Sequence, residues 1–231
     1  PCPNPLLYGL LHFIFLFVLI YPCNRFYENR NCSSARRAFV ITTVFFAVAF
    51  MLLLAAWPGN YTWDDIWIFQ EAQHYNLSPW QHFFSGLFHV LCMQTLPISC
   101  GVILIQIYLA ALIIGYSVSQ LSEDFSRTKR PFICILLLLV TLFPPILTWL
   151  FSGFRIALYS FLETLLLTKL ILIYRRRERM SLIECLKIVF LTILVASWRS
   201  EGIYYVAVIA VFFFLFRKDI LSRRKAAACF V

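Results

Sequence analysis

Lysine and arginine residues recur between the apolar stretches of this chain in an alternating pattern. Seven apolar stretches are separated by short polar breaks, and every second break is basic. Sixteen of the 20 Lys and Arg residues lie in these basic breaks, at 25–37, 127–130, 175–179 and 217–225. Loops rich in Lys and Arg stay on the cytoplasmic side of a membrane. The pattern therefore predicts a multi-span membrane protein with its N-terminus outside and its C-terminus in the cytoplasm.

Composition supports the same class of protein. The chain is 61% hydrophobic and only 13% charged, whereas soluble domains carry about 25% charged residues. We expect one all-α transmembrane domain over 1–231, a polytopic helix bundle that belongs to a longer protein whose C-terminal part is missing. A span needs about 20 apolar residues. About seven spans are predicted, near 5–22, 38–57, 97–120, 131–152, 154–174, 182–198 and 203–217.

Two other features refine this interpretation. The net charge of +9 could suggest a nucleic-acid partner, but the charges follow the topology and form no single patch, so we expect none. Every tryptophan lies either in one of the breaks that lack a basic cluster or at the end of a span next to such a break. Tryptophan prefers the membrane interface, which supports the orientation. The six are Trp57, Trp63, Trp67, Trp80, Trp149 and Trp198.

The longest break, 58–96, is expected to be an outer loop that contains short interfacial helices. Thr62 and Asp65 have the spacing of a helix N-cap and its acidic third residue, which predicts a helix from Trp63 to about Tyr75. From Trp80 onward, apolar residues recur at helical spacing and predict an amphipathic helix lying in the membrane interface. Its polar face would comprise Gln81, His82, Ser85 and His89.

Asp64 and Asp65 are the strongest candidates for chemistry. Both lie in the first turn of the predicted loop helix, where the helix dipole favours an ionised carboxylate. Such a carboxylate can accept a proton from an attacking hydroxyl group, or bind a divalent cation, the only cofactor we consider. The alternative is that both aspartates serve only to begin the helix.

Other polar residues of the outer breaks are candidates for substrate binding. Arg199 and Arg155 are the only arginines outside the basic breaks, and either could hold the phosphate of a lipid-linked substrate. Arg199 could instead pair with Glu201. The remaining candidates for contacts with a sugar or an acceptor are Gln70, His74, His82, His89 and Glu201. Alternatively, each of these residues has no specific function and lies on a solvent-exposed helix or among the lipid headgroups.

Two segments resemble a known family. Residues 58–64, Pro-Gly-Asn-Tyr-Thr-Trp-Asp, resemble the Pro-Gly-x-x-x-x-Asp signature of bacterial polytopic membrane proteins that are similar to GT-C glycosyltransferases. Residues 199–204, Arg-Ser-Glu-Gly-Ile-Tyr, resemble the Arg-x-x-Gly-x-Tyr segment of that family. Gln106 and Gly115 resemble positions in the helix that follows its loop. The resemblance implies an enzyme of the cell envelope that takes a sugar from a polyprenyl-phosphate carrier at the outer face of the bacterial inner membrane.

The expected function is therefore sugar transfer to an acceptor that the sequence does not identify. Asp64 or Asp65 would be the general base, and Arg199 with Arg155 would hold the donor phosphate. A second hypothesis is a transporter or flippase of a lipid-linked sugar or a small solute. Glu163 within a predicted span and a kink expected at Pro144 and Pro145 fit that hypothesis.

Overall fold

The chain forms a bundle of α-helices in a computed structural model that describes residues 4–28, 34–57, 59–77, 82–98, 100–121, 129–176 and 180–220. The helices are α1 (Pro5–Glu28), α2 (Ser34–Ala56), α3 (Trp63–Gln73), α4 (Phe83–Thr95), α5 (Gly101–Leu121), α6 (Lys129–Thr141), α7 (Pro144–Leu150), α8 (Ile156–Arg176), α9 (Leu182–Ala196) and α10 (Tyr204–Ile220), with a short 3-10 helix, η2 (Ser200–Ile203). Within these residues the only β-pairing is an isolated bridge between Asn60 and Ser152.

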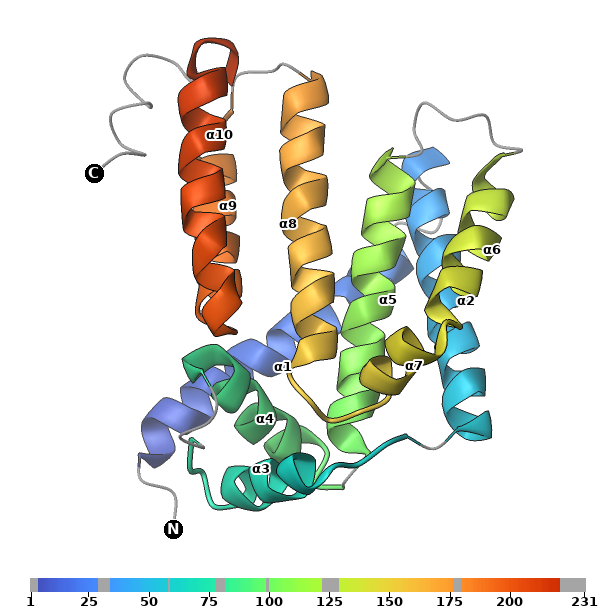
Figure 1. The fold of residues 1–231 in the computed structure, drawn as a ribbon, viewed down its shortest axis with the longest axis vertical. Coiled ribbons are helices and arrows are strands. Elements are labelled where there is room, and N and C mark those ends of the chain that lie inside the picture. The colour runs from blue at the N-terminus through green and yellow to red at the C-terminus, as the bar shows by residue number, and fades with distance from the viewer. Residues whose placement is uncertain are drawn as a thin grey trace.

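Six helices run side by side along the length of the molecule. Figure 1 shows α2, α5, α6, α8, α9 and α10 in this arrangement, with α1 crossing them obliquely and α3 and α4 lying across the lower end. The loop between α2 and α5 therefore builds a separate layer at one end of the bundle. Here we call that end, which carries α3 and α4, the loop end, and the opposite end the basic end.

Four helices are long and apolar enough to cross a membrane within the described residues. They are Pro5–Pro22, Arg36–Ala56, Gly101–Leu121 and Ile156–Arg175. A fifth span results if the bent pair α6–α7 is counted as one. The prediction of about seven spans is not confirmed, because α9 has only 15 residues and α10 is also shorter than a usual span. A helix of that length rises roughly 22 Å, against about 30 Å of hydrocarbon.

The predicted span 131–152 is broken in the structure. It divides into α6 and α7, whose axes differ by 84°. Phe143 has an extended backbone, and Pro144 and Pro145 begin α7. Proline has no N–H to donate to the preceding turn, but its fixed φ suits the start of a helix, so the break falls before the two prolines. The predicted kink is thus confirmed, and α6 and α7 together are apolar enough to be one broken span or a re-entrant loop.

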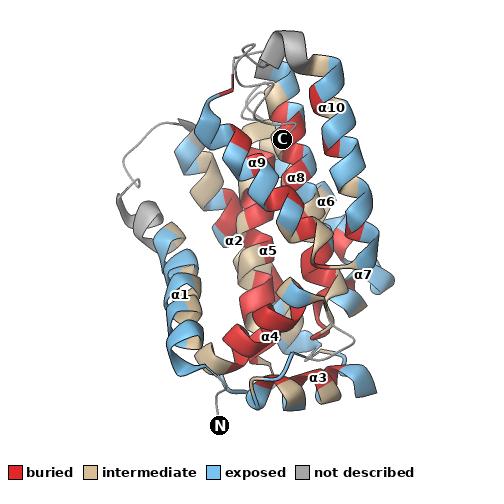
Figure 2. Cartoon of the chain, turned by 90° about the vertical axis from the view of Figure 1, so that its left-hand side faces the viewer, coloured by how far each residue is buried: buried red, intermediate tan, exposed pale blue. Residues whose placement is uncertain are grey.

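Helix α5 is the centre of the bundle. In its apolar window 72% of the residues are buried, whereas none are buried in that of α1. Figure 2 shows the same contrast, with α5 mostly buried and α1 mostly exposed at one side. One hydrophobic cluster joins α5 to α2, α6 and α7, and another joins it to α4, α8 and α9. In a membrane, lipid would cover the exposed apolar faces.

Helices α2 and α5 approach each other closely at Gly115. A Cβ atom placed there would collide with the Thr43 hydroxyl group and would lie only 3.0 Å from the Thr43 backbone nitrogen. Small residues allow such close backbone contact between membrane helices. Gly115 therefore sets the separation of α2 from the central helix.

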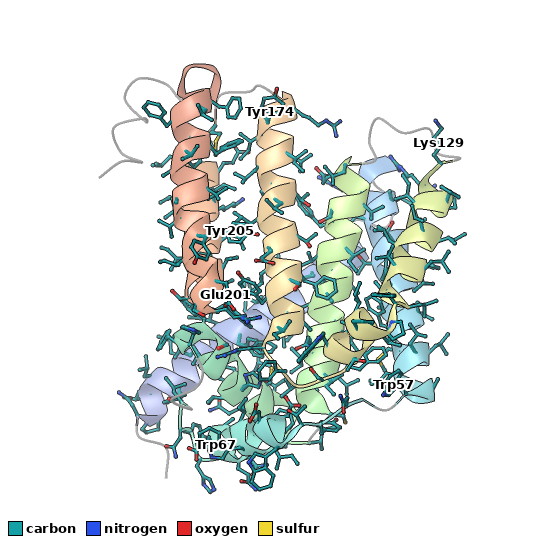
Figure 3. The ribbon with its side chains drawn as sticks, viewed as in Figure 1. Trp57, Trp67, Lys129, Tyr174, Glu201 and Tyr205 are labelled. Carbon is teal, nitrogen blue, oxygen red and sulfur yellow. The ribbon has the colours of Figure 1, made fainter. Side chains whose placement is uncertain are left out.

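Three helix ends that carry described residues of the basic breaks lie at the basic end. The first turns of α2 and α6 and the last turn of α8 lie there, and they contain Arg36, Lys129 and Arg175 respectively. Lys129 is labelled at that end in Figure 3, whereas Trp57 and Trp67 lie toward the loop end. Arg127, Arg177, Arg179 and residues 223–225 of these clusters lie outside the described residues. The segregation of charge expected from the sequence is therefore present in the fold.

Candidate functional site

The first turn of α3 places the two candidate aspartates. The Thr62 side chain accepts a hydrogen bond from the Asp65 backbone N–H, and the Asp65 carboxylate accepts one from the Thr62 backbone N–H at 2.8 Å. This reciprocal capping box confirms the helix start predicted from the sequence. Because the capping box holds Asp65, it also fixes the backbone position of the neighbouring Asp64.

The two aspartates have opposite environments. Asp64 is exposed, whereas Asp65 is fully buried. Asp65 Oδ2 is occupied by Thr62, and its Oδ1 is buried and makes no hydrogen bond within the described residues. Burial raises the pKa of the Asp65 carboxyl, although the hydrogen bonds from Thr62 lower it. Asp64 is thus the carboxylate that a substrate can reach, and Asp65 is the one that begins the helix.

Helix α4 is buried, and the prediction of an interfacial amphipathic helix is wrong. The helix begins at Phe83, and Trp80 and Gln81 lie outside the described residues. Ser85 and His89, expected on a face toward headgroups or substrate, are both fully covered. Residues 85–93 pack among α1, α3 and α5 instead. From Leu87 onward, apolar side chains lie on all sides of the helix. The helix therefore has no predominantly polar face that water could reach.

His89 joins α4 to the connection between α7 and α8. Its Nδ1 atom is 2.7 Å from the Ser85 carbonyl oxygen, and its Nε2 atom is 2.8 Å from that of Gly153. A neutral imidazole has one N–H, so only one of the two contacts can be a hydrogen bond at a time. A substrate-binding role for His89 is therefore wrong, because the side chain is enclosed and both nitrogens face backbone oxygens.

The connection at residues 151–155 is held from four directions. Asn60 N–H donates to the Phe151 carbonyl oxygen at 3.1 Å, next to the isolated bridge between Asn60 and Ser152. Gln106 Nε2 donates to the Leu150 and Ser152 carbonyl oxygens, and Trp198 Nε1 donates to that of Arg155 at 3.1 Å. With His89 at Gly153, residues from α4, α5, the loop before α3 and the loop after α9 all converge on this connection.

Arg155 and Arg199 lie close together at the loop end. Burial lowers the pKa of the Arg155 guanidinium, and the charge of Arg199 lowers it further, while the charges of Glu201 and Asp64 oppose both effects. The first turn of α3, the connection before α8 and the segment after α9 thus place the charges of Asp64, Arg199 and Glu201 within electrostatic reach of Arg155. Glu201 is labelled in Figure 3 near the lower ends of α8 and α10.

Arg199 is shared between an ion pair and an aromatic ring. Its guanidinium donates to the Glu201 carboxylate at 2.7 Å, and its central carbon lies 5.6 Å from the Tyr159 ring centroid. Its Nε atom is buried without a hydrogen-bond partner in the described residues. Hydrogen bonds from its own backbone, Ser200 and Arg199 lower the pKa of Glu201. The pairing with Glu201 considered from the sequence is confirmed, and it leaves donor capacity on Arg199 unused.

The other predicted residues do not join this cluster through any contact that the structure records. Gln70 and His74 are exposed on and just beyond α3, and His82 precedes α4 without a side-chain cap. The predicted pairing of His82 and His89 on one wet face is wrong, because His89 is enclosed. Gln70, His74 and His82 stay predictions as substrate contacts.

An apolar cavity begins beside Arg155 and follows α8 into the bundle. It measures about 830 Å³ and lies between α5, α6, α7 and α8. Ile156 and Ala157 line its loop end, and Thr168 and Leu121 line its far end. Apart from a few hydroxyl groups the lining is hydrocarbon and aromatic. A charged cluster thus stands at one end of a long apolar space.

The roles of three residues that shape the site were not predicted from the sequence. Gln106 and Trp198 hold the connection before α8, and Tyr159 lies under Arg199. A glutamine inside an apolar span was a usable signal, because buried amides need partners. No pattern in the sequence indicated which backbone oxygens those partners would be.

The buried His89 ring should make stability depend on pH. Burial lowers the pKa of His89 below its usual value of about 6.5, the Gly153 and Ser85 carbonyls and Asp65 raise it, and Arg155 lowers it. The unfolded chain therefore binds a proton more readily than the folded one. The stabilisation is complete above pH 6.5 and is lost as the pH falls through that value.

We expect the melting temperature in detergent to fall between about pH 7.5 and about pH 5, and to fall less in His89→Gln. The exposed His74→Gln variant is the matched control and should keep the wild-type slope. Equal slopes in wild type and His89→Gln would contradict the assignment. Circular dichroism at 222 nm follows the transition.

Within the described residues no group of three or more His, Cys, Asp or Glu side chains could hold a metal ion, so a cation at Asp64 or Asp65 stays a prediction. Comparison of the chain with protein-family models, with curated proteins and with solved structures gave no match. The described residues form an all-helical fold with four to five helices able to cross a membrane, and a relation to the GT-C class stays a prediction.

Proposed function

We propose that this chain is part of a membrane glycosyltransferase that takes a sugar from a polyprenyl-phosphate donor. The observation that carries the proposal is that Asp64 and Arg199 both act electrostatically on Arg155, whose neighbour Ile156 lines the loop end of an apolar cavity. A phosphate needs cationic donors, an isoprenoid chain needs apolar surface, and an acceptor hydroxyl group needs a base. All three requirements meet at the loop end.

In this mechanism the Asp64 carboxylate accepts the proton of the acceptor hydroxyl group. The acceptor oxygen forms a bond to the anomeric carbon of the sugar, and the bond from that carbon to the polyprenyl-phosphate oxygen breaks. The departing phosphate takes the electron pair. Arg155 and Arg199 stabilise the charge that develops on it, as paired guanidinium donors do for phosphate oxygens.

The ion pair with Glu201 suits this role for Arg199. Glu201 has a half-exposed side chain that fixes the arginine in place. Arg199 is only 22% exposed and retains the unpartnered Nε atom. A guanidinium has five N–H donors, so it can keep Glu201 and still bind a phosphate oxygen.

The test uses vesicles that contain the full-length protein and radiolabelled polyprenyl-phosphate sugars. Label that leaves the lipid phase with the protein present, and not without it, supports sugar transfer. If the labelled sugar stays attached to the polyprenyl phosphate for every donor tested, the proposal is overturned. The outer orientation expected from the basic breaks adds a second readout, because only donor in the outward-facing leaflet should react.

Filling the cavity should weaken donor binding without disturbing the charged cluster. Ser160 is exposed on α8 toward the cavity, one turn beyond Ile156. We expect Ser160→Trp to raise the KM for a long-chain donor about tenfold or more, since a large ring takes the place of several methylenes worth about 0.8 kcal/mol each.

A short-chain donor analogue separates the cavity from general damage. Its KM should change little in Ser160→Trp, and Leu186→Trp, at an exposed position of α9 outside the cavity, should behave as wild type with both donors. Equal losses with long and short donors would show that the cavity does not hold the chain.

A transporter or flippase is the second candidate. The 84° break between α6 and α7 favours it, because interrupted helices mark the sites of many transporters. Glu163 supports it as well, since the Tyr159 and Tyr205 hydroxyl groups both interact with this carboxyl group inside the bundle. Movement of intact lipid-linked sugar across the vesicle, without cleavage, would decide for this function.

A further inference from the structure

A second cavity lies between α8 and α9, toward the basic end. It measures about 390 Å³, and its lining runs from Leu162 to Ile173 on α8 and from Glu184 to Leu194 on α9. Tyr116 of α5 and Met180 complete the wall. This cavity shares no lining residue with the cavity beside Arg155.

Two lysines line this otherwise apolar space. Lys169 lies within the apolar span of α8, and its ammonium nitrogen is 4.4 Å from the centroid of the Tyr116 ring. Lys187 lines the cavity from α9. Neither lysine forms an ion pair within the described part of the chain. A cation at this depth is costly unless an anion or water compensates it, and an aromatic ring supplies only part of that compensation.

The one carboxylate in the lining is already engaged. Glu184 Oε2 accepts hydrogen bonds from the Ser181 backbone N–H and hydroxyl group, at 3.0 and 3.3 Å, as the capping box of α9. The charge of the cavity wall is therefore one carboxylate against two ammonium groups. An anion that enters the cavity would neutralise the excess positive charge of its wall.

From this arrangement we infer that the cavity binds one anionic phospholipid from the leaflet at the basic end. Its phosphate lies between Lys169 and Lys187, and an acyl chain fills the space among Leu165, Leu172 and Leu194. The lining favours a lipid over a free anion. Every wall residue is aliphatic, aromatic or a thioether, apart from the two lysines, Glu184 and the Tyr116 ring. The inference does not depend on the sugar-transfer proposal.

The surrounding charge supports the same occupant. Lys129 and Arg175 lie at this end of the bundle, at the start of α6 and the end of α8. Basic residues at a membrane surface attract anionic headgroups by about 1 kcal/mol each. They raise the local concentration of anionic lipid, and the cavity provides a place where a headgroup meets cations together with room for a chain.

The test is native mass spectrometry of the purified full-length protein in dioleoyl-phosphatidylglycerol or dioleoyl-phosphatidylcholine. The chains are identical, so any preference reports the headgroup. We expect phosphatidylglycerol to be retained preferentially, and the preference to fall about fivefold in Lys169→Gln and in Lys187→Gln. Lys169→Arg keeps the charge and should keep the preference. Lys129→Gln, at the same end but outside the cavity, is the matched control and should lower the preference clearly less than either cavity variant does.

Three results would overturn the inference: equal retention of both lipids, equal losses in all three glutamine variants, or displacement of phosphatidylglycerol by millimolar inorganic phosphate. The last would identify a site for a free anion. If Lys169→Gln does not fold, Lys187→Gln together with Leu194→Trp, which fills the cavity, carries the test. Catalytic activity plays no part in this readout, so failure here leaves sugar transfer untouched.

Discussion

Asp64→Asn is expected to lower kcat for sugar transfer by about 10²–10⁴-fold, the usual contribution of a general base. The asparagine amide keeps the size and exposure of the side chain but cannot accept a proton from the acceptor. Binding of the donor should persist, because Arg155 and Arg199 remain in place. The measurement compares initial rates and donor KM in vesicles with equal amounts of protein.

Glu71→Gln is the matched control for this change. Glu71 lies on the same helix as Asp64 and is partly exposed, so its loss removes an equal charge from the same layer and should alter kcat less than threefold. Asp65→Asn should mainly weaken the start of α3 by about 1 kcal/mol. Full activity in both Asp64→Asn and Asp65→Asn would rule out this mechanism. Loss in a folded Asp65→Asn alone would transfer the role to the buried carboxylate.

Gly115→Ala should destabilise the bundle by about 1–3 kcal/mol, as overpacking does in tight interiors. The added methyl group would collide with Thr43 and would lie only 3.0 Å from its backbone nitrogen, so α2 and α5 must separate along the most extensive contact in the molecule. Unfolding in mixed micelles with increasing dodecyl sulfate measures the change in free energy.

Gly9→Ala provides the control because a Cβ atom at Gly9 meets nothing within 4 Å. Alanine is a better helix former than glycine by about 1 kcal/mol, so this variant should be unchanged or slightly more stable. The two substitutions are chemically identical and differ only in what surrounds them. A Gly115→Ala protein as stable as Gly9→Ala would show that α2 and α5 adjust without cost.

The features that the sequence predicted well are those set by local chemistry. The capping box at Thr62 and Asp65, the helix that starts at Trp63 and the break before Pro144 each depend on residues within a few positions of one another. The segregation of charge also followed from the order of the stretches along the chain. In each case the residues that cause the feature are the same residues that form the sequence pattern.

The burial of α4 could not be predicted in the same way. Its helical spacing was correct, but periodicity does not tell which face meets protein and which meets solvent. The side chains taken as its wet face are small or polar ones, Ser85 and His89, and they allow the helix to pack closely while backbone oxygens satisfy the imidazole. The partner at Gly153 is distant in sequence, and no local rule connects the two.

The connection at residues 151–155 has a thermodynamic consequence for any ligand at the loop end. The backbone carbonyl oxygens of Ser152, Gly153 and Arg155 already lie within hydrogen-bonding distance of side-chain nitrogens from other elements. The segment that presents the Arg155 guanidinium is therefore ordered before a phosphate arrives. Binding then costs the conformational entropy of side chains only, so the favourable enthalpy of the phosphate contacts is retained as affinity. Calorimetry of donor binding should accordingly show a small entropic penalty, unlike that of a site assembled by a closing loop.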